Sequence, residues 1–233
     1  MSLVQAQQEP VIKMAVHWTA IFIYRVFCLL AKGYALDKKE IRALVKNLFL
    51  QNQEFLAEKS SLVCKKIIAS QQFQNALEIY AYMALPDEVD LSNVIKQALQ
   101  DGKKLALPKI ISKDDGIMKF FYLNPGKTLT EQTSNGAYGI LEPDESKPAL
   151  PDPDSKILIL VPGRAFTKNG DRLGRGKGYY DRYLSNGLLR CAHNDGDKKR
   201  LPNISVAGVC FGFQVLPELL TDPNDISMDV LFY

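Results

Sequence analysis

The sequence Ile157-Leu158-Ile159-Leu160-Val161-Pro162-Gly163 is an apolar run that ends in a Pro-Gly pair. A run of strand length without polar interruption is typical of a parallel strand that is buried on both faces. The chain continues to Arg172-Leu173-Gly174-Arg175-Gly176-Lys177-Gly178-Tyr179-Tyr180-Asp181, and residues 179–184 are expected to form a helix. A strand, a glycine-rich loop and a helix in this order predict an α/β fold in which anions bind at the helix amino terminus.

Residues 172–181, called the glycine loop below, have a composition that suits phosphate and a metal ion. Glycines at every second position let backbone N–H groups approach an anion closely. Arginine and lysine match phosphate charge, and a carboxylate is a ligand that Mg²⁺ prefers. The loop is not a Walker loop, because Lys177 is followed by Gly178, nor a dinucleotide fingerprint, because Tyr179 stands where glycine is needed. Composition alone leaves open a solvated Arg/Gly loop that touches nucleic acid.

The composition fits a single domain with a full hydrophobic core. The chain has 233 residues, of which 46% are hydrophobic, and residues 37–233 contain no stretch that resembles a linker. Its 29 Lys and Arg are nearly balanced by 26 Asp and Glu, so no nucleic acid partner is expected. The cysteines are far apart and the histidines are too few for a metal centre, which favours free thiols in a reducing compartment: Cys28, Cys64, Cys191, Cys210, His17 and His193.

Helical and strand patterns alternate along the domain, as an α/β fold requires. Asp37 followed by Glu40 predicts a capping box that opens a first helix, and Ser60 or Ser61 is expected to cap a second helix that reaches about residue 69. A third helix is predicted over residues 91–100. The predicted strands cover residues 78–84, 104–107, 117–123, 157–161, 205–211 and 228–232, and residues 194–202 are expected to form a surface insertion.

The first 36 residues form a separate apolar extension. Residues 11–31 are nearly long enough to span a bilayer, but Arg25 near their centre would be costly there. An added N-terminal helix, or a translated region upstream of the functional start, is therefore favoured over a signal peptide or membrane anchor. We expect a cytoplasmic protein without stable membrane association. A targeted or membrane-associated protein is the alternative if residues 1–36 are a genuine signal or anchor.

Several segments resemble one enzyme family and occur in that family's order. The glycine loop with the preceding Gly170-Asp171, together with Val161-Pro162-Gly163 and Phe166, closely resembles the signature of 5-formyltetrahydrofolate cyclo-ligases, also called methenyltetrahydrofolate synthetases. The further matching segments are Lys38-Lys39-Glu40-Ile41-Arg42, residues 80–90, Tyr138-Gly139-Ile140-Leu141-Glu142-Pro143, Asn224-Asp225 and Met228-Asp229. The resemblance covers residues 37–233, which we interpret as one catalytic domain.

The resemblance implies a fold, a reaction and its ligands. The implied fold is a three-layer α/β/α sandwich with a mostly parallel sheet, of the type shared with ribose-phosphate isomerases and CoA transferases. The implied reaction converts 5-formyltetrahydrofolate and ATP, with Mg²⁺, to 5,10-methenyltetrahydrofolate, ADP and phosphate. Both reacting groups come from substrates, so the protein would act by positioning and charge stabilisation. The expected enzyme is a monomer whose partners are ATP and the folate, with or without a polyglutamate tail.

The resemblance also assigns roles to single residues. Arg175 and Lys177 would be catalytic, because they would neutralise charge that develops during phosphoryl transfer. Met83 and Glu88 would contact the folate, Glu88 by accepting hydrogen bonds from the pterin amino groups. Asp181 and Asp229 would hold Mg²⁺. ATP would be bound by Lys38, Arg42, Arg172, Gly174, Arg175, Gly176, Lys177, Gly178, Tyr179 and Tyr180, and the two tyrosines would also face the pterin or the formyl group, unless one of them packs in the core.

Two positions depart from the family pattern and keep other functions open. Thr167 stands where the family usually has aspartate, and Arg164 stands where it usually has a small or apolar residue. These changes are compatible with a folate- or nucleotide-binding regulator that has lost turnover. The other alternative is an RNA-binding module in which the tyrosines of the glycine loop stack on bases. The dispersed charge of the chain argues against that module.

Overall fold

The computed structural model describes residues 36–144, 148–150, 152, 154–187 and 203–233. The expected N-terminal extension, apart from residue 36, and the expected insertion at residues 194–202 lie outside these ranges. Among the described helices, none combines the length and the apolar content that crossing a membrane requires.

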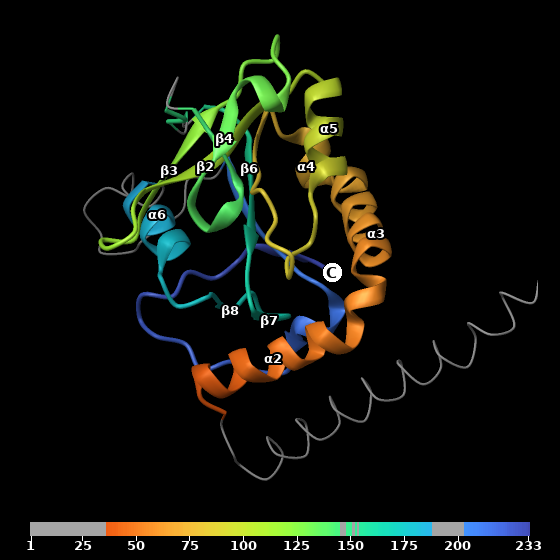
Figure 1. Ribbon diagram of the computed structural model, residues 1–233, viewed down its shortest axis with the longest axis vertical. Helices are drawn as coiled ribbons and strands as arrows, with labels where there is room; N and C mark the ends of the chain where they lie inside the picture. Colours follow the sequence, from red (N-terminus) through yellow and green to blue (C-terminus); the bar gives the residue numbers. More distant parts are fainter. Residues whose placement is uncertain (1–35, 145–147, 151, 153, 188–202) are drawn as a thin grey trace, which may run out of the picture.

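A six-stranded sheet forms the centre of the domain, with the strand order β11-β9-β6-β1-β2-β3 (Figure 1). All neighbouring strands are parallel except β2 and β3, which confirms the mostly parallel sheet expected from the sequence. The predicted central strand is β6, which pairs with β1 and β9 and is buried along nearly its whole length. The strands are β1 (Glu78–Tyr80), β2 (Lys104–Ser112), β3 (Ile117–Tyr122), β6 (Ile157–Pro162), β9 (Ile204–Val209) and β11 (Val230–Phe232).

Alternate side chains of the strands enter two different cores, one on each face of the sheet. Ile79 enters the core that α2, α3 and α5 cover, whereas Tyr80 enters the core that α6 covers. Figure 1 shows α3 and α5 on one side of the strands and α6 on the opposite side. The three-layer α/β/α arrangement is therefore confirmed. These helices are α2 (Lys38–Asn52), α3 (Leu56–Ala69), α5 (Ser92–Gln100) and α6 (Tyr179–Gly187).

Helix α2 begins as the sequence predicts. The Asp37 carboxylate accepts hydrogen bonds from the N–H groups of Lys39 and Glu40 at 2.8 and 2.7 Å. The Glu40 carboxylate in turn accepts one from the Asp37 N–H at 2.8 Å. This capping box satisfies N–H groups that a helix amino terminus otherwise leaves unpaired. The helix then buries an apolar face that includes Val45 and Leu48.

The prediction that Ser60 or Ser61 caps the next helix is wrong. Helix α3 already begins at Leu56, directly after the 3₁₀ turn η1 (Gln53–Phe55), so both serines lie inside it. The chain passes from η1 into α3 without a side-chain cap. The Ser60 hydroxyl instead accepts a hydrogen bond from the Asp90 N–H at 3.2 Å, which ties α3 to the chain that follows β1. The predicted end of this helix near residue 69 is correct.

Several strand limits differ from the predicted ones because pairing decides them. The predicted strand 78–84 ends at Tyr80, whereas β2 continues to Ser112 because it pairs with β3. The sequence patterns do not predict the shorter elements. These are α4 (Gln71–Asn75), η2 (Leu129–Glu131), β4 (Thr133–Asn135), η3 (Ala137–Gly139), β5 (Leu141–Pro143), β7 (Ala165–Thr167), β8 (Arg172–Leu173), η4 (Gly212–Gln214) and β10 (Val215–Leu216). Strands β10, β7 and β8 form a second, small sheet next to the end of β6.

The buried Glu78 carboxylate in β1 lets us test what its hydrogen bonds contribute to the stability of the central sheet. The Glu78 side chain is fully buried and accepts hydrogen bonds from the Tyr122 hydroxyl at 2.6 Å and from Lys104 Nζ at 3.3 Å. We expect Tyr122→Phe to lower the free energy of unfolding by about 2 kcal/mol, because it removes a hydrogen bond to a charged group. Urea unfolding measures the change. Tyr138→Phe is the control, because Tyr138 is exposed and its hydroxyl meets a neutral hydroxyl, that of Tyr179, at 3.4 Å. An equal loss in both variants would contradict the role given to Glu78.

Candidate active site

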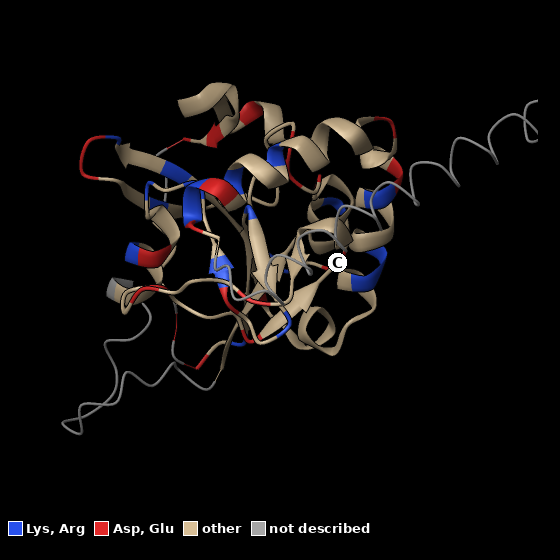
Figure 2. Ribbon diagram, turned by 90° about the horizontal axis from the view of Figure 1, so that it is seen from below, with Lys and Arg blue, Asp and Glu red and all other residues tan. Residues whose placement is uncertain are grey.

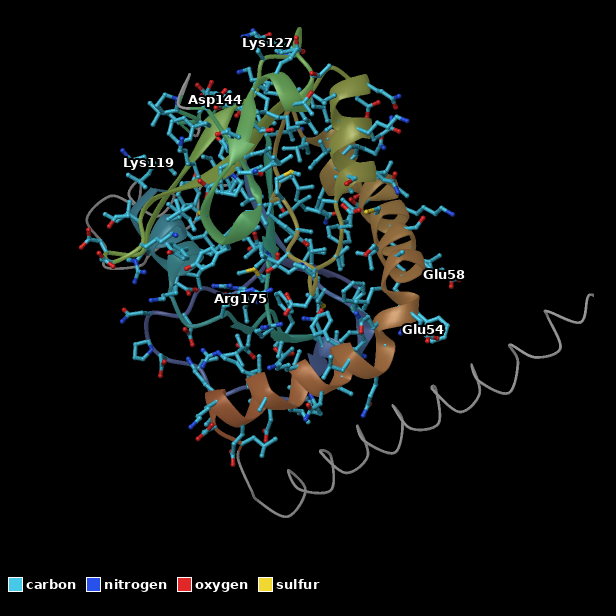
Figure 3. The ribbon with its side chains drawn as sticks, viewed as in Figure 1. Glu54, Glu58, Lys119, Lys127, Asp144 and Arg175 are labelled. Carbon is cyan, nitrogen blue, oxygen red and sulfur yellow. The ribbon has the colours of Figure 1, made fainter. Side chains whose placement is uncertain are left out.

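The candidate site lies beyond the carboxyl ends of the central parallel strands, where open α/β sheets bind ligands. Strand β6 leads into the β10-β7-β8 sheet, which folds the chain back so that the glycine loop starts beside β6. The Arg164 N–H donates to the Leu173 carbonyl at 2.7 Å. The Gln214 side-chain amide donates to the carbonyls of Gly163 and Arg164 at 2.8 and 2.9 Å. In Figure 3, Arg175 of the glycine loop lies between these strand ends and helix α2.

The glycine loop needs glycine at two of its positions. The φ angles are +103° at Gly176 and +66° at Gly178, and residues with a side chain rarely adopt such values. A Cβ at Gly178 would also lie 2.9 Å from Nη1 of Arg182. The Arg182 guanidinium holds the loop in place, because it donates to the Lys177 carbonyl and, at 2.9 Å, to the Gly116 carbonyl. The loop therefore follows a fixed path to the start of α6.

Arg172 is the buried cation of the glycine loop. Only 4% of its side chain is exposed, and its Nη2 donates to Oδ1 of Asp181 at 2.7 Å. Its Nη1 donates to the Pro162 carbonyl at 3.2 Å, and its guanidinium lies 5.8 Å from the centroid of the Tyr180 ring. Arg172 thus fixes Asp181 and Tyr180 relative to the end of β6. A cation buried this deeply needs its counter-ion, so Asp181 also contributes to stability.

Four residues, Asp87, Glu88, Arg164 and Arg175, make up what we call the charge cluster. The Asp87 carboxylate accepts hydrogen bonds from both arginines, from Arg175 on Oδ1 and from Arg164 on Oδ2. Arg175 Nε also donates to Glu88 Oε1 at 3.0 Å, while Glu88 Oε2 accepts from the Leu85 N–H at 3.0 Å. Burial acts to raise the pKa of Asp87, but the hydrogen bond from Arg175 and the two positive charges outweigh it and hold that pKa below its ordinary value.

Helix α2 contributes two cations one turn apart, Lys38 and Arg42. Arg42 Nε donates to the Gly174 carbonyl at 3.0 Å, so Arg42 lies against the glycine loop. Lys38 Nζ pairs with Asp222 at 2.7 Å and with Asp225 at 2.6 Å. Burial acts to lower the pKa of Lys38, but the two carboxylates outweigh it and raise that pKa. Lys38 therefore ties α2 to the C-terminal segment.

The remaining predicted contacts to ATP and folate have varied surroundings. Lys177 is exposed, and no described residue pairs with its ammonium group. Tyr180 packs edge-on against Phe120, with the ring centroids 6.5 Å apart. Tyr179 meets the Tyr138 hydroxyl at 3.4 Å. Met83 is partly buried against the core that α3 and α5 cover. The two tyrosines thus differ, with Tyr180 further into the domain.

The two predicted metal ligands also differ in their surroundings. Asp181 lies in the first turn of α6 and pairs with Arg172. The Asp229 carboxylate accepts a hydrogen bond from the Val206 N–H at 2.7 Å. Within the described ranges, no group of three or more His, Cys, Asp or Glu side chains is arranged to hold a metal ion. Mg²⁺ beside a nucleotide takes only one or two carboxylates together with phosphate and water oxygens, so the two aspartates fit that ion. Their role as its ligands stays a prediction.

Comparison with known proteins identifies the family of this chain. Residues 35–233 match the 5-formyltetrahydrofolate cyclo-ligase family. The chain belongs to this family. Among the cyclo-ligases, the mouse 5-formyltetrahydrofolate cyclo-ligase is 31% identical over 198 residues, which cover 84% of this chain and 89% of the mouse protein. The probable 5-formyltetrahydrofolate cyclo-ligase of Schizosaccharomyces pombe is 29% identical over 202 residues, which cover 84% of this chain and 95% of the yeast protein.

A solved structure extends the likeness to the cyclo-ligase fold. The NMR structure of the 5,10-methenyltetrahydrofolate synthetase of Aquifex aeolicus matches this chain with a TM-score of 0.64 at 31% sequence identity. The match covers 83% of this chain and 88% of that one. Both the family and the fold predicted from the sequence are therefore confirmed.

Some residues that shape this cyclo-ligase site are not among the predicted ones. Asp87 lies inside the matched segment 80–90 but has no assigned role there, and Arg164 is noted in the sequence only as a departure. Arg182 and Gln214 hold the loops through backbone carbonyls, which no motif signals. Only the acidic turn and the unusual arginine offered a sequence signal, namely opposite charges in two matched segments.

Acid should weaken the contacts around this site. Burial acts to raise the pKa of Asp225, but hydrogen bonds from Lys38 and from the Asp222 N–H outweigh it, so the pKa of Asp225, like that of Asp87, is lowered. A carboxylate whose folded pKa is lowered stabilises the chain above its unfolded pKa of about 3.9, and this contribution is lost as the pH falls through the folded value. We therefore expect the free energy of unfolding to fall below about pH 4, as measured by urea unfolding.

Matched variants check the origin of this acid effect. Asp225→Asn should destabilise the chain at neutral pH and have little effect at a pH below both pKa values, where the carboxyl is already neutral. Asp222→Asn is the control, because 69% of the Asp222 side chain is exposed and its pair with Lys38 contributes little. A destabilisation by Asp225→Asn that does not change with pH would contradict the assignment.

Proposed function

We propose that this chain catalyses the ATP-dependent conversion of 5-formyltetrahydrofolate to 5,10-methenyltetrahydrofolate, with ADP and phosphate as the other products. The observation that carries the proposal is the meeting of the glycine loop, Arg42 and the charge cluster at one end of the sheet. Cations there suit a triphosphate, and the neighbouring carboxylates suit the amino groups of a pterin. Membership of the cyclo-ligase family supports the same reaction.

The reaction needs charge stabilisation and not a nucleophile from the protein. The formyl oxygen of the folate attacks the γ-phosphorus of ATP, the bond to ADP breaks, and the formyl group becomes an iminium phosphate. The neighbouring folate nitrogen then attacks the formyl carbon and gives up its proton to solvent, and phosphate leaves with the formyl oxygen. Arg175 and Lys177 neutralise the charge on the transferring phosphoryl group. Lys38 and Arg42 bind the ATP phosphates from α2.

The glycine loop and two aspartates hold the nucleotide and its metal. Backbone N–H groups from Gly174 to Tyr180 face the phosphates at the start of α6, where the helix dipole favours anions. The Arg172 side chain holds this loop against the end of β6, because it donates a hydrogen bond to the Pro162 carbonyl. Asp181 and Asp229 hold Mg²⁺, which, when bound, neutralises the phosphate oxygens of ATP.

The chain that follows β1 forms the proposed folate contact. The Glu88 side chain is only 9% exposed, and the Leu85 N–H fixes one of its oxygens at 3.0 Å. This leaves Oε1, the oxygen that faces Arg175, to accept hydrogen bonds from the pterin. Met83 contributes an apolar contact, and Tyr179 faces the ring from the glycine loop.

The fold accommodates both departures from the family pattern. The Thr167 hydroxyl donates to Asp171 Oδ2 at 2.7 Å and accepts from the Asp171 N–H at 3.1 Å, which closes the turn between β7 and β8. Arg164 is paired with Asp87. Because both residues support the site, a binding regulator without turnover is the weaker alternative. Figure 2 shows acidic and basic stretches interspersed along the described ribbon, which does not favour an RNA-binding module.

We also propose the setting in which the enzyme works. Residues 37–233 form the catalytic domain, and residues 1–36 are not needed for catalysis. The enzyme acts as a monomer in the cytoplasm on 5-formyltetrahydrofolate, with or without a polyglutamate tail.

Formation of the methenyl chromophore tests the proposed function. The full-length chain is mixed with 5-formyltetrahydrofolate, and the absorbance is followed with ATP and Mg²⁺ both present and with each omitted. We expect the chromophore only in the complete mixture, together with equal amounts of ADP and phosphate. A regulator would bind ATP and the folate without forming product. No product from the folded chain in the complete mixture would overturn the proposal.

A further inference from the structure

The charge cluster connects the proposed nucleotide and folate contacts through one carboxylate. Asp87 accepts a hydrogen bond from Arg164 on one oxygen and from Arg175 on the other. Arg175 also donates to Glu88 at 3.0 Å. In the proposed function, Arg175 serves the phosphates and Glu88 serves the pterin. The contact between Arg175 and Glu88 must therefore break when both substrates are bound.

Arg164 and Arg175 differ in how tightly the surrounding structure holds them. The Arg164 backbone is fixed at its N–H, which donates to Leu173 at 2.7 Å, and at its carbonyl, which accepts from Gln214 at 2.9 Å. Its side chain is 15% exposed, and its guanidinium lies 5.9 Å from the centroid of the Phe49 ring. The Arg175 side chain is 35% exposed and is flanked by glycine on both sides. Arg175 is therefore the arginine that can leave Asp87, and Arg164 is the one that stays.

We propose that Arg164 is a positioning residue that allows Arg175 to exchange the two carboxylates for phosphate, and that through this exchange folate and nucleotide each raise the affinity for the other. The inference rests on the proposed function. In the resting arrangement, Arg175 holds Asp87 and Glu88. In the ready arrangement, Arg175 turns to the nucleotide and Glu88 accepts from the pterin. Asp87 stays paired with Arg164, so this partly buried carboxylate keeps a counter-ion when Arg175 leaves.

This exchange predicts how strongly the two substrates are coupled. Each of them binds the ready arrangement, so one bound substrate removes the cost of leaving the resting arrangement for the other. The nucleotide Kd without folate then equals the Kd at saturating folate multiplied by a factor of one plus the ratio of resting to ready molecules. Folate must show the same factor in response to nucleotide, because coupling of binding free energies is reciprocal.

Titration calorimetry on the full-length chain tests the coupling. The probes are the ATP analogue with a methylene bridge between the β- and γ-phosphates, with Mg²⁺, and 5-methyltetrahydrofolate, which has no formyl oxygen to phosphorylate. We expect each probe to lower the Kd of the other by the same factor, about fivefold or more. A factor of one in a chain that forms methenyl product overturns the inference and leaves the proposed function intact. A chain that forms no product overturns the proposed function and this inference with it.

Variants at Arg164 and Asp87 distinguish positioning from direct contact. Arg164→Ala leaves Asp87 with Arg175 alone, which favours the resting arrangement. The Kd of the ATP analogue should rise about tenfold without folate and equal the wild-type value at saturating 5-methyltetrahydrofolate, so the coupling factor grows. Asp87→Asn should reduce the coupling factor toward one. Arg164→Ala should then have no further effect in the Asp87→Asn background, because the two residues act as a pair.

Three outcomes in the variants would overturn the proposal. If Arg164→Ala bound the ATP analogue with a higher Kd than the wild type at saturating folate, Arg164 would be a phosphate contact. An undiminished effect of Arg164→Ala in the Asp87→Asn background would mark a general structural role. Failure of Arg164→Lys, which keeps the positive charge, to restore most of the wild-type coupling would show that charge on Asp87 is not the cause. Arg164→Lys also provides the test if Arg164→Ala does not fold.

Discussion

Asp181→Asn should reduce turnover by about two orders of magnitude or more, and it should also lower stability. The loss of turnover follows if the Asp181 carboxylate holds the metal that neutralises ATP during phosphoryl transfer. The loss of stability follows from Arg172, which has a side chain only 4% exposed and would keep no counter-ion at this contact. We expect about 2 kcal/mol, less than for a fully buried pair, because 24% of the Asp181 side chain is exposed.

Turnover at increasing Mg²⁺ and urea unfolding measure the two effects of Asp181→Asn separately. From the sequence alone we would expect only the first, since the pair with the buried Arg172 is visible only in the structure. Asp171→Asn is the matched control, because Asp171 is also an acid of this region but bonds a neutral hydroxyl, that of Thr167, at 2.7 Å. Near-normal turnover of Asp181→Asn at saturating Mg²⁺ would exclude Asp181 as a metal ligand.

Lys177→Ala should lower kcat about a hundredfold and also raise the KM for ATP, with no change in stability. An ammonium beside the transferring phosphoryl group stabilises the transition state more than it stabilises bound ATP. Stability should stay the same because the Lys177 side chain is exposed and pairs with no described residue. Arginine should not restore kcat, because a planar guanidinium cannot replace a compact point charge.

Steady-state kinetics with varied ATP separate the two effects of Lys177→Ala. Lys168→Ala is the matched control, because Lys168 is another exposed lysine, in the turn between β7 and β8. We expect its kcat and KM to stay within about twofold of the wild-type values. An unchanged kcat with only a higher KM in Lys177→Ala would make Lys177 a docking contact and not a catalytic residue.

The central sheet could be predicted from the sequence because its signals are local. The uninterrupted apolar run at residues 157–161 indicates a doubly buried strand, and Asp37 with Glu40 indicates a helix start wherever the rest of the chain lies. Strands β8 and β10 contain too few residues to show any periodicity, and they exist only because β7 lies between them. The serine at position 60 resembles a cap, but tertiary contact turns its hydroxyl toward Asp90 instead.

The candidate site divides in the same way between local and distant signals. The glycine loop is a continuous motif, so its residues and their proximity to a strand end could be predicted from the sequence. The charge cluster joins residues that are far apart in the sequence. Asp87 and Arg164 are separated by 77 positions, and Asp87 and Arg175 by 88 positions. Opposite charges occur throughout the chain, so only the fold selects which of them meet. The charge cluster, which carries the proposed coupling, therefore had to come from the structure.

The C-terminal segment has a consequence for how the protein is made. Its edge strand β11 completes the sheet, its Met228 N–H donates to the Gly170 carbonyl at 2.8 Å, and its Asp225 pairs with Lys38 on the first described helix. During translation these residues leave the ribosome after helix α2 and the glycine loop. Helix α2 and the glycine loop must wait for them, although both are synthesised earlier. A chain that lacked this segment would lack these contacts, so the early part of the site reaches its final arrangement only after the later residues have been made.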